Sequence, residues 1–264
     1  MTQHTTQESR TALVTGATSG IGLAVARLLA TQGHRVYIGA RDAQNVAATV
    51  KELQQQGLDV DGSTLDVRSA DSVTAFVQAA VDRFGTVDVL VNNAGRSGGG
   101  VTADLTDELW EDVIDTNLNS VFRMTRAVLN TGGMRHKSRG RIINIASTAG
   151  KQGVVLGAPY SASKHGVVGF TKALGNELAP TGITVNAVCP GYVETPMAQR
   201  VRAGYAAAYD TTEDKILEKF QAKIPLGRYS TPEEVAGLVG YLASDTAASI
   251  TAQALNVCGG LGNF

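Results

Sequence analysis

The sequence has few cysteines, and their scarcity counts against two classes of protein. The chain of 264 residues contains two, Cys189 and Cys258, and neither has a second cysteine or a histidine at the spacing of metal ligands. A disulfide framework and a zinc site are therefore both poorly supported, and no metal is expected. We predict that each thiol is buried among apolar residues, the usual environment of a free cysteine.

The sequence also lacks an excess of charge of either sign. It has 23 basic and 24 acidic residues, which gives a formal net charge of -1. No overall field favours nucleic acid or an anionic membrane as a partner. Any anionic partner must therefore be bound by a local basic patch.

Long apolar runs are missing as well. No stretch approaches the ~18 consecutive apolar residues of a membrane-spanning helix. The first ten residues, MTQHTTQESR, lack the apolar segment of a signal peptide. We therefore expect a soluble, cytoplasmic protein with a flexible tail at residues 1–10.

What the sequence does contain is an alternation of short β-rich runs with helix-length amphipathic segments, without a fixed-period repeat or a linker. Nearly continuous apolar strands that alternate with helices predict an α/β fold with a doubly wound parallel sheet. With 43% hydrophobic residues, one domain over residues 11–264 accounts for the whole pattern. The predicted strands are residues 11–15, 35–40, 60–65, 87–95, 140–147, 183–191 and 254–260.

One segment, residues 191–226, departs from this alternation. It is rich in alanine and charged residues and has no strand pattern. We interpret it as a helical insertion that covers a cleft as a lid, and an ordinary surface helical hairpin is the equal alternative. Its aromatic residues Tyr205, Tyr209 and Phe220 would face a long planar substrate or pack in a core.

A glycine-rich turn, TGATSGIG, follows the first predicted strand and opens a helix. Such a turn lets the backbone approach a pyrophosphate, and the free N–H groups and the positive dipole end of the helix stabilise its charge. The glycine spacing differs from the standard dinucleotide fingerprint, so a plain turn is the alternative. The predicted cofactor contacts in this turn are Gly16, Thr18, Ser19, Gly20, Ile21 and Gly22.

The end of the second predicted strand indicates which dinucleotide binds. An NAD enzyme carries Asp or Glu there for the ribose hydroxyls, but this sequence has Arg41, which can pair with a 2′-phosphate. We therefore predict NADP(H), and a solvated strand-end charge is the alternative. After the third strand, at Asp66 and Val67, the carboxylate is expected to accept a hydrogen bond from the adenine amino group.

The turn Asn92-Asn93-Ala94-Gly95 follows the fourth predicted strand. Its Asn side chains can tie strand ends together, and its glycine lets a cofactor pass close to the backbone. We predict cofactor contacts at Asn93, Ala94 and Gly95, and a purely structural turn is nearly as well supported.

The candidates for catalysis follow the fifth predicted strand. Ser147 ends that strand, and Lys164 lies at i+4 from Tyr160, so the phenol and the ammonium share one helix face. A positive charge ~4 Å away at an effective dielectric of ~20 contributes ~4 kcal/mol. We therefore predict a lowered pKa for Tyr160 as a general acid, although desolvation acts in the opposite direction.

Two polar residues complete the predicted chemistry. Ser147 would hydrogen-bond a substrate carbonyl oxygen as it gains negative charge. Asn117, in DTNLNSVF, would hold a water molecule or a freed carbonyl and extend a proton path from Lys164, which would also bind the nicotinamide ribose. Each residue alone has a structural alternative, as a cap, a buried amide or a surface pair with Tyr160. Together, beside a nucleotide-binding turn, they favour catalysis.

These motifs resemble the short-chain dehydrogenase/reductase family in order and spacing over nearly the whole chain. The matching segments are TGATSGIG, NNAG, an Asn in the following helix, YSASK and CPGYVETPM. The resemblance implies a Rossmann-like sheet of seven strands, a homotetramer and a catalytic set of Asn117, Ser147, Tyr160 and Lys164. It also implies cofactor contacts at Pro190, Gly191, Val193 and Thr195.

Within the family, NNAGRSGGG, KQGVVLGAPYSASKHGVVGFTKALG and ALNVCGGLGNF are similar to ketoreductases of type II (aromatic) polyketide synthases, of the actinorhodin type. The resemblance implies reduction by NADPH of one ketone of a poly-β-ketone chain tethered to an acyl carrier protein. Ser97 stands where several relatives have proline, so the loop is expected to be looser. The implied substrate contacts are Ser97, Gly98, Gly99, Gln152, Val154 and Tyr205.

An acyl carrier protein is acidic, so docking requires local cations. Arg68 and Arg96, near the cleft rim in the family's layout, are candidates for the phosphopantetheine phosphate. One alternative function is a 3-oxoacyl-acyl-carrier-protein reductase of fatty acid synthesis, with the same chemistry on a flexible chain. Another is a non-catalytic NADP-sensing domain, which the intact pair of Tyr160 and Lys164 disfavours because a sensor needs no acid.

Overall fold

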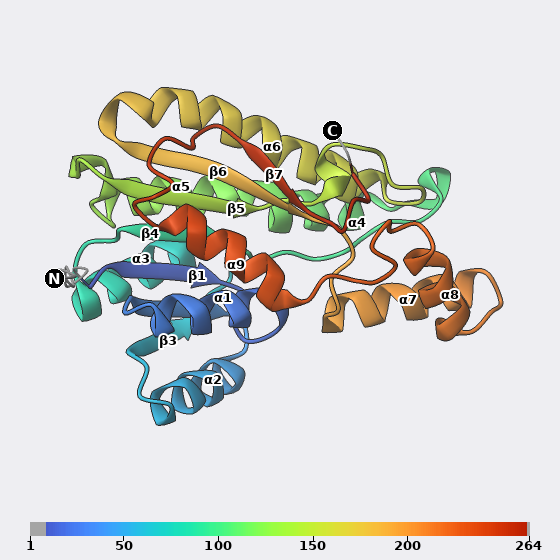
Figure 1. Cartoon of the computed structure of the whole chain (residues 1–264), viewed down its shortest axis with the longest axis horizontal. Helices are drawn as coiled ribbons and strands as arrows, with labels where there is room; N and C mark the ends of the chain where they lie inside the picture. The colour runs from blue at the N-terminus through green and yellow to red at the C-terminus, as the bar shows by residue number, and fades with distance from the viewer. Residues whose placement is uncertain (1–8, 263–264) are drawn as a thin grey trace, which may run out of the picture.

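The computed structural model describes residues 9–262 and is organised around one parallel sheet. Its seven strands lie in the order β3-β2-β1-β4-β5-β6-β7 (Figure 1). The chain starts in the middle of the sheet, and the change of direction between β1 and β4 is where such sheets bind ligands. The strands are β1 Thr11–Thr15, β2 Arg35–Ala40, β3 Val60–Thr64, β4 Val89–Asn92, β5 Gly140–Ile145, β6 Ile183–Pro190 and β7 Ala254–Val257.

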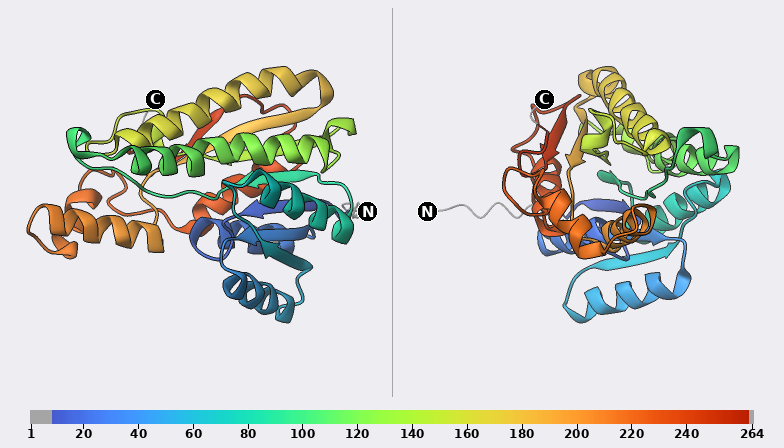
Figure 2. Two further views of the ribbon diagram at one scale, coloured as in Figure 1. Left: turned by 180° about the vertical axis from the view of Figure 1, so that it is seen from behind. Right: turned by 90° about the vertical axis from the view of Figure 1, so that its right-hand side faces the viewer.

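Helices cover both faces of this sheet, as Figure 2 shows from behind and from the side. α1, α2 and α9 pack on one face, and α3, α5 and α6 pack on the other. The helices are α1 Gly20–Thr31, α2 Ala43–Gln55, α3 Ala70–Phe84, α4 Asp107–Ile114, α5 Ser120–Asn130, α6 Ala158–Leu178, α7 Pro196–Ala208, α8 Glu213–Gln221 and α9 Pro232–Ala243. The predicted doubly wound α/β fold is confirmed.

The two cores explain why the strands read as continuous apolar runs. In β1, Ala12 and Val14 belong to the core under α1 and α9, whereas Leu13 belongs to the core under α3 and α5. Successive residues of a strand point to opposite faces, and both faces are covered here. A central strand therefore has apolar residues at every position rather than at alternate ones.

Several predicted strands are too long at their carboxyl ends. The predicted strand over residues 87–95 is β4 at Val89–Asn92, and the one over 140–147 is β5 at Gly140–Ile145. The extra residues leave the sheet ladder and form turns instead. Asn93 and Ser147, which lie in those turns, are candidate site residues.

The predicted helical insertion is confirmed as helices α7 and α8, which project beyond the carboxyl ends of the strands (Figure 1). It has a small core of its own, in which Phe220 is 5% exposed and its ring lies 4.8 Å from that of Tyr192. Phe220 is therefore a packing residue rather than a substrate contact. Tyr209, by contrast, is half exposed.

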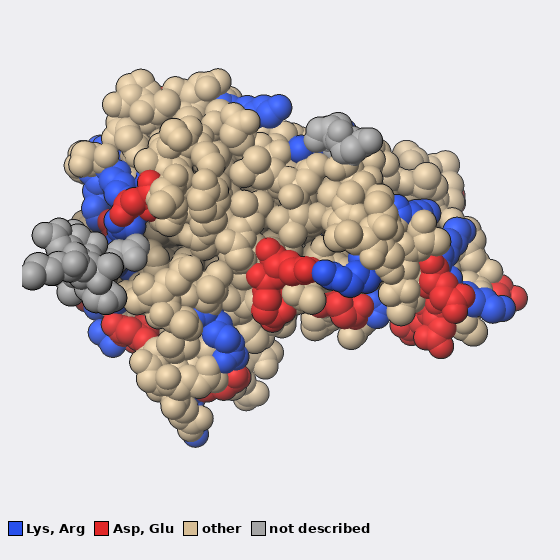
Figure 3. Space-filling model, viewed as in Figure 1, with Lys and Arg blue, Asp and Glu red and all other residues tan. Residues whose placement is uncertain are grey.

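Both cysteines are buried and unpaired, as predicted. Within residues 9–262 there is no group of three or more His, Cys, Asp or Glu side chains that could hold a metal ion, and no helix long and apolar enough to cross a membrane. On the face in Figure 3, charges of both signs are interspersed over the lid, and the surface above β7 and α6 carries few charges.

Candidate active site

The glycine-rich turn packs directly against the turn that follows β4. Asn93 donates from Nδ2 to the carbonyls of Thr15 and Gly16, at 2.9 and 3.0 Å. A Cβ atom on Gly22 would lie 2.3 Å from the Gly16 oxygen and 2.4 Å from Asn93 Nδ2. Gly16 itself has φ +65°, a left-handed conformation that favours glycine. The two turns can therefore meet only with glycine at these positions.

Helix α1 begins at this junction, and its first turn faces the start of the lid. Ser19 is the N-cap residue but makes no side-chain cap, so no side chain from the cap competes for the first N–H groups. A Cβ atom on Gly20, whose φ is +53°, would lie 3.1 Å from Thr195 Cγ2. Thr195 in turn caps α7 by accepting from the N–H of Ala198. Thr18 and Ile21 belong to the same turn and are half-buried.

The charged residues after β2 and β3 lie close enough to interact. Arg41 is exposed and has no hydrogen bond or ion pair with any residue between 9 and 262, although its charge lowers the pKa of Asp66. The main cause of that lowered pKa is Arg68, which donates to Asp66 from its backbone N–H, Nε and Nη2. The Asp66 carboxylate is thus already engaged, and the adjacent Val67 is 6% exposed and packs in the core.

The two arginines predicted to face a carrier protein share one carboxylate. Arg68 donates from Nη1 to Asp112 Oδ1 at 3.0 Å, and Arg96 pairs with the other oxygen of Asp112. Both guanidinium groups remain about 40% exposed. They therefore form one fixed, solvent-accessible cluster at the start of α4.

Asn117 lies in a π-helical turn, Asp115–Asn119, that joins α4 to α5. The widened turn turns its side chain inward, where it is 1% exposed. Asn117 Oδ1 accepts from the N–H of Arg96 at 2.8 Å, and Nδ2 donates to the Arg96 carbonyl at 3.0 Å and to Ser163 Oγ at 3.1 Å. The amide thereby fixes the segment just after Gly95, where a Cβ atom would lie 3.2 Å from Asn117 Oδ1.

Ser147, Tyr160 and Lys164 come together at the end of β5. Lys164 is 5% exposed and donates from Nζ to the Ile145 carbonyl at 2.8 Å, and this Nζ lies 5.7 Å from the centroid of the Tyr160 ring. Ser147 caps a short 3₁₀ turn by accepting from the N–H of Ala149. Gly95 closes the group from the other side, because its added Cβ atom would lie 3.7 Å from Lys164 Nζ.

The predicted direction of the Tyr160 pKa shift is wrong. Burial raises the pKa of Tyr160, and an interaction with the Ser147 hydroxyl lowers it by less. Burial also lowers the pKa of Lys164 to about 8, because the charged amine loses water. Desolvation thus outweighs the attraction between the two groups, whereas the prediction gave more weight to the charge.

The walls of the adjacent cleft meet at the loop before α6. The N–H of Gly100 donates to the Leu156 carbonyl at 2.8 Å, and a Cβ atom on Gly99 would lie 2.0 Å from the same oxygen. From the lid, Tyr205 donates through its hydroxyl to the Val155 carbonyl at 3.0 Å. Leu156 adopts φ 60°, an unfavourable conformation for leucine. The loop expected to be loose without proline is therefore anchored by its glycines.

Other predicted residues have mainly packing roles in the structure. A Cβ atom on Gly98 would lie 2.3 Å from Val113 Cγ2, and one on Gly191 would lie 2.9 Å from Cys258 Cβ. The remaining ones are Ser97, whose carbonyl accepts from Arg96 Nε, Gln152, whose N–H donates to Thr148, Val154, which is 39% exposed, and the buried Pro190 and Val193. Ala94 donates its N–H to Thr15 Oγ1 at 2.9 Å.

Sequence reasoning missed the polar residues that support these turns. Asn92 Nδ2 donates to Asn144 Oδ1 at 2.8 Å, and Asn144 Nδ2 donates to Thr171 Oγ1 at 2.9 Å, so a chain of buried hydrogen bonds crosses from β4 through β5 to α6. Thr15 Oγ1, at the end of β1, accepts from the N–H of Asn93. A polar residue inside an apolar strand was the available signal for Asn144, because a buried amide must find partners.

Comparisons with known proteins identify similar chains along the whole length. The family model described as short chain dehydrogenase matches residues 10–206. A protein assigned as the ketoacyl reductase of the monensin polyketide synthase in Streptomyces virginiae is 84% identical over 264 residues, which is all of both chains. The 3-oxoacyl-acyl-carrier-protein reductase of Escherichia coli is 41% identical over 254 residues, which is 96% of this chain and 98% of that one.

A solved structure agrees with the same relationship. A variant of the actinorhodin polyketide ketoreductase, crystallised with NADPH, superposes with a TM-score of 0.95 at 61% identity. The superposition covers 98% of this chain and 99% of that one. The similarity therefore includes the lid and the turns around the site, and not the sheet alone.

Proposed function

The chain belongs to the short chain dehydrogenase family, and from this premise we propose that it is an NADPH-dependent ketoreductase. Its substrate in this proposal is one ketone of a poly-β-ketone chain tethered to an acyl carrier protein, in the biosynthesis of an aromatic polyketide. The reductase domain spans residues 11–264, and residues 191–226 form its lid. The observation that carries the proposal is the cluster of Ser147, Tyr160 and Lys164 beside a turn that only glycine can form.

The residues around the glycine-rich turn fit a dinucleotide. Gly16, Gly22 and Gly95 lie where a Cβ atom would collide or crowd the turn, so the backbone itself forms the surface that a cofactor approaches. The uncapped start of α1 offers N–H groups to a pyrophosphate. Arg41, exposed and without a partner among the described residues, is suited to the 2′-phosphate of NADP. NADPH, when bound, supplies the hydride for the reaction.

In the proposed mechanism Tyr160 is the general acid. A phenol whose pKa is raised by burial keeps its proton at neutral pH, which is the state that an acid needs. An alkoxide forming next to it is far more basic than a phenolate, so the proton moves to the product oxygen. Ser147, which interacts with the phenol, stabilises the same oxygen as its negative charge develops.

Lys164 and Asn117 support this acid in different ways. The pKa of Lys164 is about 8, so the amine is mostly protonated at pH 7 and its charge stabilises the phenolate once the proton has left. Asn117 acts on position, because it holds the Arg96 backbone and Ser163 with every hydrogen bond that the structure gives it. We further propose that Lys164 binds the ribose of the cofactor.

The polyketide substrate is favoured over a fatty acid precursor by similarity. Relatives at 84% and 61% identity are named as polyketide reductases, whereas the fatty acid enzyme is 41% identical. The cleft walls at Gly99, Val154 and Tyr205, anchored on the loop before α6, are the proposed substrate contacts. Arg68 and Arg96 are proposed to bind the phosphopantetheine phosphate, with Asp112 fixing their geometry. A cytoplasmic homotetramer, as in the family, completes the proposal.

A comparison of ketone substrates tests this function. With NADPH in excess, we expect kcat/KM for a rigid bicyclic ketone to exceed that for a short acetoacetyl thioester, because anchored walls favour a preformed shape. Reconstitution with a minimal polyketide synthase should then give a product with one ketone reduced, detected by mass spectrometry. Strong preference for the linear thioester would instead identify the fatty acid reductase. NADPH binding without turnover of either ketone would identify the sensing domain.

Replacing Arg41 with glutamine tests the cofactor assignment. Loss of a guanidinium that pairs with a 2′-phosphate should weaken NADPH binding by about 10- to 100-fold and leave NADH binding nearly unchanged. Fluorescence titration of both dinucleotides measures this directly. Lys51→Gln, an exposed charge removal on α2, is the matched control, and equal losses for NADPH and NADH in Arg41→Gln would contradict the assignment.

A further inference from the structure

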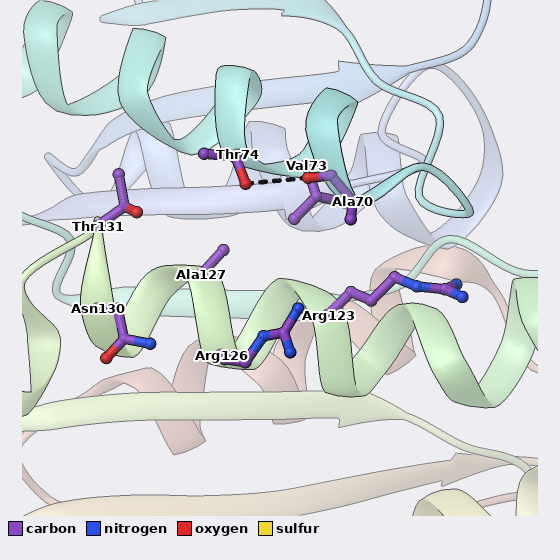
Figure 4. A pocket seen from close by; sticks show the side chains of 8 residues that line it. All are labelled: Ala70, Val73, Thr74, Arg123, Arg126, Ala127, Asn130 and Thr131. Atoms are coloured by element: carbon purple, nitrogen blue, oxygen red, sulfur yellow. Dashed lines mark hydrogen bonds between the residues drawn. The ribbon is translucent and has the colours of Figure 1, made fainter.

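A second cavity, separate from the site described above, lies between α3 and α5. It has a volume of about 120 Å³. Figure 4 shows Ala70, Val73 and Thr74 on the α3 side and Arg123 and Arg126 on the α5 side. The eight residues that line it are Ala70, Val73, Thr74, Arg123, Arg126, Ala127, Asn130 and Thr131.

The chemistry of this lining is one-sided. Among the described residues that line the cavity there are two arginines and no Asp or Glu. The Asn130 side-chain oxygen already accepts from Arg135, which leaves its NH₂ group as the free part of the amide. The Thr74 hydroxyl donates to the Ala70 carbonyl within α3. The lining therefore offers mainly positive charge and N–H donors.

Arg123 provides the observation that points to a ligand. Its Nη2 donates to Asp115 Oδ1 at 2.7 Å, but its Nη1 is buried and has no hydrogen-bond partner. A buried donor without a partner is rare in proteins, and a bound ion is one of the groups that can satisfy it. Arg126 adds a second guanidinium, which lies 4.9 Å from the Phe122 ring centroid and has no carboxylate partner among residues 9–262.

The helix ends indicate where in the cavity a negative charge is favoured. Ala70 is the first residue of α3, where the helix dipole is positive, and in Figure 4 it lies at the same end of the cavity as Arg123. Thr131 follows the last residue of α5, where the dipole is negative, at the opposite end. Both dipoles and the unsatisfied guanidinium therefore favour an anion near Ala70.

We propose that this cavity is a binding site for an oxyanion, a phosphate group or a carboxylate, held by Arg123 and Arg126. Two guanidinium forks suit the paired oxygens of such groups better than a spherical ion. The volume is enough for a tetrahedral phosphate group. The anion is a small phosphate from solution or the Asp or Glu side chain of a second copy of the chain.

Calorimetric titration with inorganic phosphate tests the proposal, in full-length protein saturated with NADP⁺ so that the dinucleotide site is filled. At constant ionic strength we expect one saturable phosphate site per chain. Arg126→Gln should bind phosphate about tenfold or more weakly, since a charged hydrogen-bond partner is lost. Arg83→Gln, which removes a half-exposed charge at the far end of α3, should bind like the wild type.

Sedimentation of the same proteins distinguishes the two sources of the anion. If phosphate does not bind but Arg126→Gln dissociates an oligomer that Arg83→Gln keeps, the site takes a carboxylate of a second copy. Arg123→Gln should reproduce whichever loss Arg126→Gln shows. Equal phosphate affinity in wild type and Arg126→Gln, or no saturable binding together with an unchanged oligomer, would overturn the proposal.

Discussion

The Tyr160→Phe variant is expected to lose ketone-dependent NADPH oxidation by at least about 100-fold, the lower range for general acid catalysis by a positioned side chain. The substitution keeps the aromatic ring beside Lys164 Nζ, 5.7 Å from the ring centroid, and removes only the hydroxyl. The alkoxide then has no phenolic proton to accept. Steady-state absorbance of NADPH with a bicyclic ketone measures the loss.

Two further measurements make this result specific to catalysis. NADPH affinity, from fluorescence titration, should be nearly unchanged because the glycine-rich turn and Arg41 lie outside the substitution. Tyr205→Phe is the matched control, since it removes a hydroxyl that donates to the Val155 carbonyl in the cleft wall. We expect it to change KM more than kcat. If Tyr160→Phe were as active as the wild type, Tyr160 would have no role as the acid.

The fold could be predicted because its local and global signals agree. Strands buried on both faces must be apolar throughout, and that pattern is enough to locate all seven strands. The strand ends were less predictable. Asn93 leaves the ladder to bond Thr15 and Gly16, a contact with a distant part of the chain that no local pattern of the β4 segment reveals.

The site could be predicted as a set of residues but not as a set of contacts. The i+4 spacing of Tyr160 and Lys164 placed both on one helix face. It did not reveal that the amine would donate to the Ile145 carbonyl, which is a neighbour only after β5 and α6 have packed. Ser163, which bonds Asn117, is likewise one residue from Lys164 in sequence but acquires its role through the π-helical turn.

The pKa of Tyr160 shows most clearly what a sequence leaves out. Spacing gives the distance between two charges, and from that distance alone an attraction follows. The desolvation of each group depends on how tightly the surrounding helices and strands close over it, and here it raises the pKa of Tyr160 and lowers that of Lys164. Burial is a property of the packed whole, so its sign prevailed over a local charge.

Replacing Lys164 with methionine is expected to reduce kcat/KM by about 100-fold. A unit charge 5.7 Å from the phenol ring, at an effective dielectric of ~20, stabilises a phenolate by ~3 kcal/mol. Methionine has a similar length and no charge, so it removes this contribution while filling the buried space. Lys172→Met, an exposed lysine on the same helix α6, should retain normal activity.

The pH dependence of stability gives the same lysine an independent test. In the folded protein the pKa of Lys164 is lowered from 10.5 to about 8. The desolvation penalty is therefore fully present below pH 8 and is relieved as the pH rises toward 10.5, because the unfolded chain then binds more protons than the folded one. Urea unfolding should show the wild type gaining stability relative to Lys164→Met between pH 7.5 and ~10. A constant difference over that range would mean that Lys164 titrates normally, and its charge would then be too well solvated to stabilise the phenolate as proposed.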